Sequence, residues 1–149
     1  MTVPHEFIPV GWDPPRSFDG PGFRLEPLGP AHNERDHEAW SSSMDHIRDT
    51  PGEWGDWPRP MTLADNLADL EGHAREFADR EAFTYSVLDG DEVIGCLYIY
   101  PDDEGPTDAY VSSWVTERRA EMDTVVWRAV SKWLDEEWPF RDFRYAVRQ

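Results

Sequence analysis

Alternation of apolar and polar residues marks the predicted strands of the chain. Residues 83–88 alternate regularly, a pattern typical of a strand with one buried face. Residues 93–100 follow as an almost continuous apolar run broken only by Gly95, and Asp89-Gly90-Asp91 is a turn that joins the two runs as a hairpin. We predict strands over 23–28, 83–88, 93–100, 109–115 and 143–147.

Three stretches carry the spacing of an amphipathic helix. The clearest begins at Thr62, where Asp65 completes a capping box, and apolar residues then recur every three or four positions to about Arg80. The stretch 122–138 has a broad apolar face and ends before a proline, which cannot continue a helix. The stretch 31–48 has a weaker apolar stripe, and we predict a helix there as well.

The order of these elements is strand, helix, helix, strand, strand, strand, helix, strand, which is an α+β arrangement. A helix between the last two strands implies a right-handed crossover, so these two should be parallel within a mostly antiparallel sheet flanked by helices. The prolines within residues 1–22 exclude a regular helix or a central strand of a sheet, and we predict an extended arm there. Residues 23–149 then form a single domain, the size expected for one core.

Charge narrows the classes of partner. The 31 carboxylates outnumber the 14 Lys and Arg residues and give a formal net charge of -17, so we do not expect nucleic-acid binding. Lys132 is the only lysine, which suggests a GC-rich genome or adaptation to high salt. The sequence begins without the features of a signal peptide and has no apolar run of membrane-spanning length, so we expect a cytoplasmic protein with no membrane association.

The element order and three short motifs resemble the GNAT superfamily of acyl-CoA-dependent N-acetyltransferases over roughly residues 23–148. The motifs are the Val93-Ile94-Gly95 start of the long strand, the Ser113-Trp114-Val115 strand, and Arg118-Arg119 before the next helix. The resemblance implies acetyl-CoA or another acyl-CoA as cofactor. The strand main chain would pair with pantetheine, and the turn would present N–H groups to the pyrophosphate. The cofactor residues implied are Ser113, Trp114, Val115, Arg118, Arg119, Ala120, Glu121, Met122 and Asp123.

The turn departs from the family pattern. Counted from Arg118, the two positions that are normally small hold Glu121 and Asp123, whose carboxylates would repel a pyrophosphate. Counted from Arg119, the same positions hold residues whose side chains still block close backbone approach. Alternatively, the two acids complement the dipole of the helix while the two arginines are solvated, and no phosphate binds there.

The family normally continues beyond its fifth strand with a further helix and two strands, whereas this sequence ends at Gln149. We therefore expect the last strand to lie at an open edge of the sheet. Such edges are usually covered, and the N-terminal arm or a second subunit in a homodimer would serve.

Other candidate residues lie on the long strand, at the start of the strand after it, in the first helix and in the loop that follows that helix. Tyr98, Tyr100 and Asp108 occupy positions where GNAT-like enzymes carry acid–base groups, although packing explains them as well. Trp40, Trp54 and Trp57 come from the region that shapes the acceptor pocket in the family, and they are equally explained as structural plugs.

The remaining histidines, Asp36 and the single cysteine carry no predicted chemistry. His32, Asp36, His37 and His46 lack a third ligand at defined spacing, so we predict no metal site. Cys96 lies in an apolar strand and is interpreted as core filling.

Three functions remain open at this point. The resemblance implies transfer of an acyl group to a small amine, by direct attack on the thioester with a main-chain oxyanion contact near Val115 and Asp108 as base. The second hypothesis is a GNAT-like ligand-binding or interaction module that no longer binds coenzyme A. The third is an enzyme of different chemistry in the same cleft.

Overall fold

The structure is a computed structural model and describes residues 7–148 of the chain. The elements in chain order are β1 (Phe18–Gly20), β2 (Phe23–Pro27), η1 (Pro30–His32), α1 (Asn33–Ser41), α2 (Met44–Asp49), α3 (Leu63–Ala78), β3 (Phe83–Asp89), β4 (Glu92–Pro101), β5 (Ala109–Val115), η2 (Glu117–Arg119), α4 (Met122–Glu137) and β6 (Phe143–Tyr145).

One six-stranded sheet organises the fold, with its strands in sequence order from β1 to β6. Every neighbouring pair is antiparallel except β5 and β6, which are parallel and joined by α4. The mixed, mostly antiparallel sheet predicted from the sequence is therefore confirmed.

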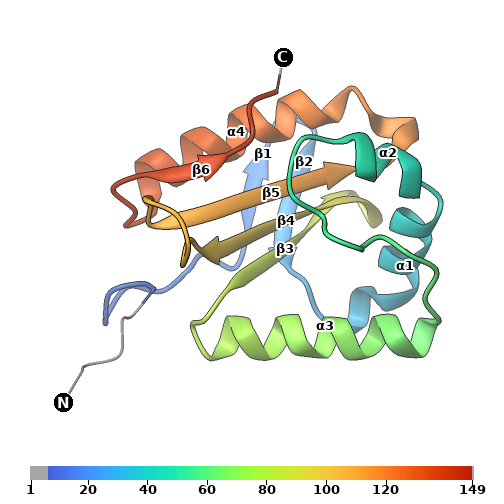
Figure 1. The fold of residues 1–149 in the computed structure, drawn as a ribbon, viewed down its shortest axis with the longest axis horizontal. Helices are drawn as coiled ribbons and strands as arrows, with labels where there is room; N and C mark the ends of the chain where they lie inside the picture. Colours follow the sequence, from blue (N-terminus) through green and yellow to red (C-terminus); the bar gives the residue numbers. More distant parts are fainter. Residues whose placement is uncertain (1–6, 149) are drawn as a thin grey trace.

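The helices cover both faces of the sheet. Figure 1 shows α4 along one face, with α1 and α3 on the opposite side. Successive side chains of β5 point to opposite faces of the sheet. Val111 and Val115 pack in the core beneath α4, and Trp114 packs with the residues of α1 and α3. Trp114 and the deepest residue of α1, Trp40, are both almost completely buried.

The capping box predicted at the start of α3 is present. The Thr62 hydroxyl accepts a hydrogen bond from the Asp65 N–H at 3.0 Å, and the Asp65 carboxylate accepts one from the Thr62 N–H at 3.4 Å. The single helix predicted over 31–48 is wrong, because the chain breaks it at two serines. Ser42 donates its hydroxyl to the Ala39 carbonyl at 3.1 Å, and Ser43 is the N-cap of the separate helix α2. Serine side chains compete with the helical backbone for hydrogen bonds in this way.

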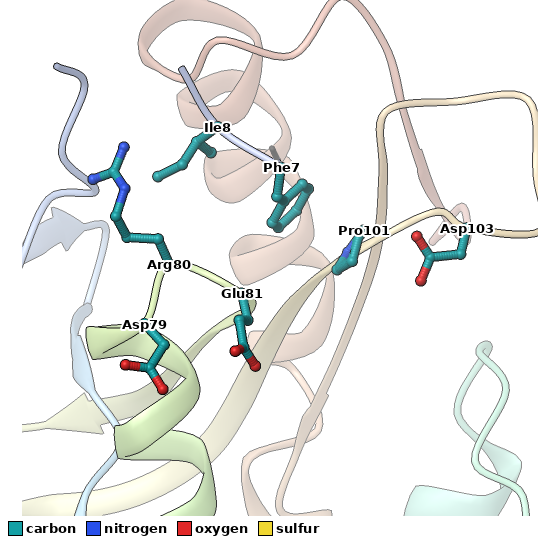
Figure 2. Close-up of a pocket in the computed structure, with 7 residues that line it drawn as sticks. All are labelled: Phe7, Ile8, Asp79, Arg80, Glu81, Pro101 and Asp103. Atoms are coloured by element: carbon teal, nitrogen blue, oxygen red, sulfur yellow. The ribbon is translucent and has the colours of Figure 1, made fainter. Parts of the chain in front are cut away.

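The proline-rich N-terminal segment packs against the body of the protein. Phe7 stacks on Phe140 at 5.2 Å, and Trp12 lies 4.9 Å from Trp138 between ring centroids. Arg80, just after α3, donates to the carbonyls of residues 9 and 12 at 2.8 Å each. A cavity of about 400 Å³ lies at this junction. Figure 2 shows its lining residues, with the Arg80 side chain extended towards the N-terminal segment.

Within this segment, β1 pairs with β2 as an edge strand, a position that the neighbouring prolines permit. Residues 1–6 of the predicted arm lie outside the described residues. The division of the chain into an arm and a domain stays a prediction.

Candidate functional site

The three tryptophans predicted to shape an acceptor pocket lie together. The rings of Trp40 and Trp57 are 5.6 Å apart, and Trp54 lies 6.2 Å from Trp57. Trp57 also lies 6.1 Å from Trp114, and Trp54 lies 6.2 Å from Tyr98, so the loop after α2 folds back onto β4 and β5.

These rings line a cavity of about 360 Å³ on the α1 and α3 side of the sheet. Its volume lies within the ordinary range for small-molecule sites, about 300–1,000 Å³. The aromatic lining residues are Trp40, Trp54, Trp57, Tyr98 and Tyr100. The polar lining residues are Asp36, Glu53, Asn66, Asp69, His73 and Ser112, and the remaining two are Leu28 and Leu70.

The two predicted tyrosines are held as neutral phenols. Trp114 donates its indole N–H to the Tyr98 hydroxyl at 3.0 Å, and burial raises the Tyr98 pKa well above its usual value. Burial also raises the pKa of Tyr100 to about 12. Both side chains therefore remain protonated at neutral pH and serve the cavity as aromatic surface and hydroxyl groups.

A buried carboxyl group forms part of the cavity wall. The Asp36 carboxylate of α1 accepts a hydrogen bond from the side-chain amide N–H of Asn66 on α3 at 3.1 Å. The oxygen of that amide accepts a hydrogen bond from the Trp40 indole N–H, also at 3.1 Å. Burial raises the Asp36 pKa to about 6, the Asn66 hydrogen bond opposes the rise, and Asp69 adds to it.

Sequence reasoning considered Asp36 only as a metal ligand and missed Asn66 and His73. The signal for both was a polar residue on the inward face of one helix, α3. The Nδ1 atom of His73 lies 3.2 Å from the Thr84 hydroxyl and 3.4 Å from a Glu76 carboxylate oxygen. Burial nevertheless lowers the His73 pKa, which favours the neutral imidazole at pH 7.

Asp108 lies away from the tyrosines with which it was grouped. Its carboxylate accepts a hydrogen bond from the Arg141 N–H at 2.8 Å and lies 3.6 Å from the Arg141 guanidinium. It does not contribute to the described lining of the cavity. The structure thus brings Tyr98 and Tyr100 together with the tryptophans, but not Asp108.

The strand predicted to pair with pantetheine already has an internal partner. β6 pairs with β5 only from Ala109 to Val111, so the two strands no longer pair alongside Ser113. There the Ser113 carbonyl accepts a hydrogen bond from Arg148 at 2.8 Å, and the Ser113 hydroxyl lies 2.5 Å from the Tyr145 hydroxyl.

Several main-chain N–H groups of the turn after β5 already have hydrogen-bond partners within the protein. The Glu117 N–H donates to the Ser43 hydroxyl at 3.0 Å. The N–H groups of Arg119, Ala120 and Asp123 donate to main-chain carbonyls within the turn at 3.0, 3.2 and 3.1 Å.

The two arginines of the turn are engaged in ion pairs. Arg118 lies 2.7 Å from Glu92, and Arg119 lies 3.0 Å from Asp89 and 3.3 Å from Glu121. Arg119 is partly shielded from solvent by these contacts, with its side chain 24% exposed.

These residues do not fit coenzyme A in this conformation. The Ser113 carbonyl is taken by Arg148, several turn N–H groups are internally bonded, and two carboxylates stand where small residues would admit a pyrophosphate. We assign no chemical step to the cofactor here.

Among residues 7–148, no group of three or more His, Cys, Asp or Glu side chains is arranged to hold a metal ion. Within the same residues, no helix has the length and apolar character needed to cross a membrane.

Comparison with known proteins identifies the fold. No protein-family model matches the chain, and no curated protein sequence matches it. Solved acetyltransferase structures do resemble it. The ribosomal-protein-S5-alanine acetyltransferase from Vibrio fischeri has 16% identity and a TM-score of 0.60, over 79% of this chain and 66% of that one.

Two further structures were solved with bound nucleotides. RimL, a ribosomal L7/L12 alpha-N-protein acetyltransferase in complex with coenzyme A, has 15% identity and a TM-score of 0.59, over 78% of this chain and 66% of that one. The microcin C7 self-immunity acetyltransferase MccE, in complex with acetyl-CoA and AMP, has 15% identity and a TM-score of 0.59, over 77% of this chain and 62% of that one. The chain thus spans at most 66% of the length of each of these three proteins. At such identities the likeness establishes the GNAT fold, as the sequence motifs predicted, and no more than the fold.

Proposed function

We propose that this protein binds a small organic cation, a protonated amine, in the cavity between α1, α3 and the β4–β5 strands. The observation that carries the proposal is the chemical composition of the cavity wall. Its aromatic rings stand beside the carboxyl groups of Asp36, Glu53 and Asp69, and none of its described lining residues is Arg or Lys.

Both components of this wall attract a positive charge. A cation over the face of a tryptophan gains about 0.5–2 kcal/mol, and more as water is excluded. The Asp36 pKa of about 6 leaves its carboxylate mostly ionised at pH 7, although the group is buried. A buried carboxylate is costly without a counter-charge, and an ammonium ligand would supply one.

Isothermal titration calorimetry with three ligands of one shape tests this proposal. Benzylammonium, benzyl alcohol and benzoate share a ring but differ in charge. We expect benzylammonium to bind at least about tenfold more tightly than the alcohol, a difference of about 1.4 kcal/mol, and benzoate not to bind. Equal affinity for the alcohol or the benzoate would contradict recognition of a cation, and so would no binding of benzylammonium at millimolar concentration.

Acylation of the bound amine is the second candidate function. The shared fold of the acetyltransferases favours it, as does the position of the cavity against the strand that the resemblance assigns to pantetheine. Incubation with acetyl-CoA and benzylamine, followed by mass spectrometry, tests it through formation of N-acetylbenzylamine. Cation binding without acetylated product would contradict acylation and would support ligand binding as the function.

A further inference from the structure

The segment Ala146–Arg148 follows β6 and turns a charged side chain into the protein. Arg148 is only 5% exposed. Its Nη2 donates to the Ser113 carbonyl, its Nε to the Asp123 carboxylate and its Nη1 to the Ala146 carbonyl, each at 2.8 Å. The guanidinium also lies 5.7 Å from the centre of the Tyr145 ring.

These contacts explain how a guanidinium is accommodated in the interior. A buried charge is tolerated only when it is paired and hydrogen-bonded, and here one carboxylate and two carbonyls provide both. The rigid fork of an arginine suits this arrangement, because its N–H groups point to several acceptors at once. Asp123, at one of the positions where the family pattern has a small residue, thus has a defined partner in Arg148.

We propose that Ala146–Arg148 is an internal strap that fills the groove between β5 and the start of α4, so that this groove admits a pantetheine chain only when Arg148 is displaced or removed. The pairing of β6 with β5 stops after Val111, so beyond that point the two strands are no longer joined by main-chain hydrogen bonds. The Ser113 carbonyl lies beyond that point and takes its hydrogen bond from Arg148, where the fold would offer it to a ligand. The strap therefore accounts for the poor fit of coenzyme A by direct occupation, in addition to the repulsion by the acidic turn.

Pantetheine is the appropriate probe because it lacks the phosphates and adenine of coenzyme A and so tests the groove without the acidic turn. Calorimetry would measure pantetheine binding to the wild type, to Arg148→Ala and to a double variant with Arg148→Ala and Asp123→Gly. The double variant also removes the carboxylate that loss of Arg148 leaves unpaired. The matched control is Arg128→Ala, an exposed arginine on α4 whose loss changes the net charge equally.

We expect no pantetheine binding by the wild type or by Arg128→Ala at millimolar concentration. We expect at least a tenfold gain in affinity in the double variant. Arg148→Ala alone should lower the melting temperature by about 10 °C, because it leaves the Asp123 carboxylate, only 21% exposed, without its ionic partner. Pantetheine binding by the wild type as tight as by the variants would overturn the proposal, and so would no binding by any of them.

A second measurement needs no variant in the strap. In the wild-type protein, the Nε–H proton of Arg148 should exchange slowly with water by ¹⁵N NMR, because it is buried and bonded to Asp123. The corresponding proton of exposed Arg128 should exchange rapidly. Equal, rapid exchange at the two residues would show that the strap is not seated, even if Arg148→Ala fails to fold.

Discussion

At the scale of single residues, Asp36 carries a conflict between stability and ligand binding. Its carboxyl group is 4% exposed and has one amide donor, so removal from water raises its pKa from 3.8 to about 6. A raised pKa means that the folded protein binds this proton more tightly than the unfolded chain does. From this group alone, stability is therefore greatest below about pH 4 and falls as the pH rises through 6.

The first prediction concerns Asp36→Asn, which removes the charge and keeps the shape. A shift of about two pKa units corresponds to about 3 kcal/mol at most, so we expect the free energy of unfolding at pH 7 to rise by about 1–3 kcal/mol while benzylammonium binding weakens. Urea denaturation and calorimetry measure the two effects. Asp135→Asn, at an exposed position of α4, is the control and should change neither. A less stable Asp36→Asn protein with unchanged binding would contradict the prediction that the Asp36 charge lowers stability and favours binding of the cation.

The second prediction is the pH dependence of binding in the wild type. The cation should bind the ionised form of Asp36, whose pKa is about 6. Its affinity should be nearly constant above pH 7 and fall about tenfold by pH 5. In Asp36→Asn this dependence should largely disappear, since the titrating group is gone. Affinity that rises on acidification would assign the pH response to another group.

At the scale of elements, the sequence predicted those parts that local patterns determine. The helix α3, with its Thr62 cap, and the β3–β4 hairpin follow from spacing and turn residues, and the parallel β5–β6 pair follows from the handedness of a crossover. The break between α1 and α2 was missed because it depends on serine hydrogen bonds.

The candidate site was predictable only in part. Trp40, Trp54 and Trp57 were identified because they come from the region that shapes the acceptor pocket in the family that the sequence resembles. The contact of Arg148 with Ser113 was not predicted, because it joins residues 35 positions apart through the tertiary fold.

The third prediction concerns the close approach of β4 and β5 at Gly95. A Cβ atom on this residue would collide with the main-chain carbonyl of Trp114. We expect Gly95→Ala to lower the free energy of unfolding by about 2–3 kcal/mol, because strand backbones in the middle of a sheet move apart only at the expense of their hydrogen bonds. It should also weaken benzylammonium binding, since Trp114 supports Tyr98 in the cavity wall.

Gly29→Ala is the matched control for that variant. Its added Cβ meets nothing within 4 Å, and its backbone φ of -153° suits any residue. Its stability should stay within about 0.5 kcal/mol of the wild type. Equal stability of the two alanine variants in urea would show that the sheet relaxes around residue 95 without loss.

At the scale of the whole molecule, the net charge of -17 produces long-range repulsion among the carboxylates. This repulsion destabilises the fold, whereas local ion pairs stabilise it. In most ion pairs among the described residues at least one of the two side chains is exposed to solvent, as with Arg48 and Asp45, and such pairs contribute little to stability. The pair of Arg148 with Asp123 is different, because both side chains are largely shielded from solvent.

The fourth prediction follows from this difference. Raising NaCl from about 0.05 M to 1 M shortens the screening length to about 3 Å, which weakens the repulsion between distant carboxylates more than it weakens a buried pair in contact. We therefore expect the melting temperature to rise with salt. A double variant with Asp135→Lys and Glu137→Lys, both at exposed positions of α4, reduces the negative charge and should show a smaller rise. A melting temperature that falls with salt would mean that surface ion pairs stabilise the protein more than its net charge destabilises it.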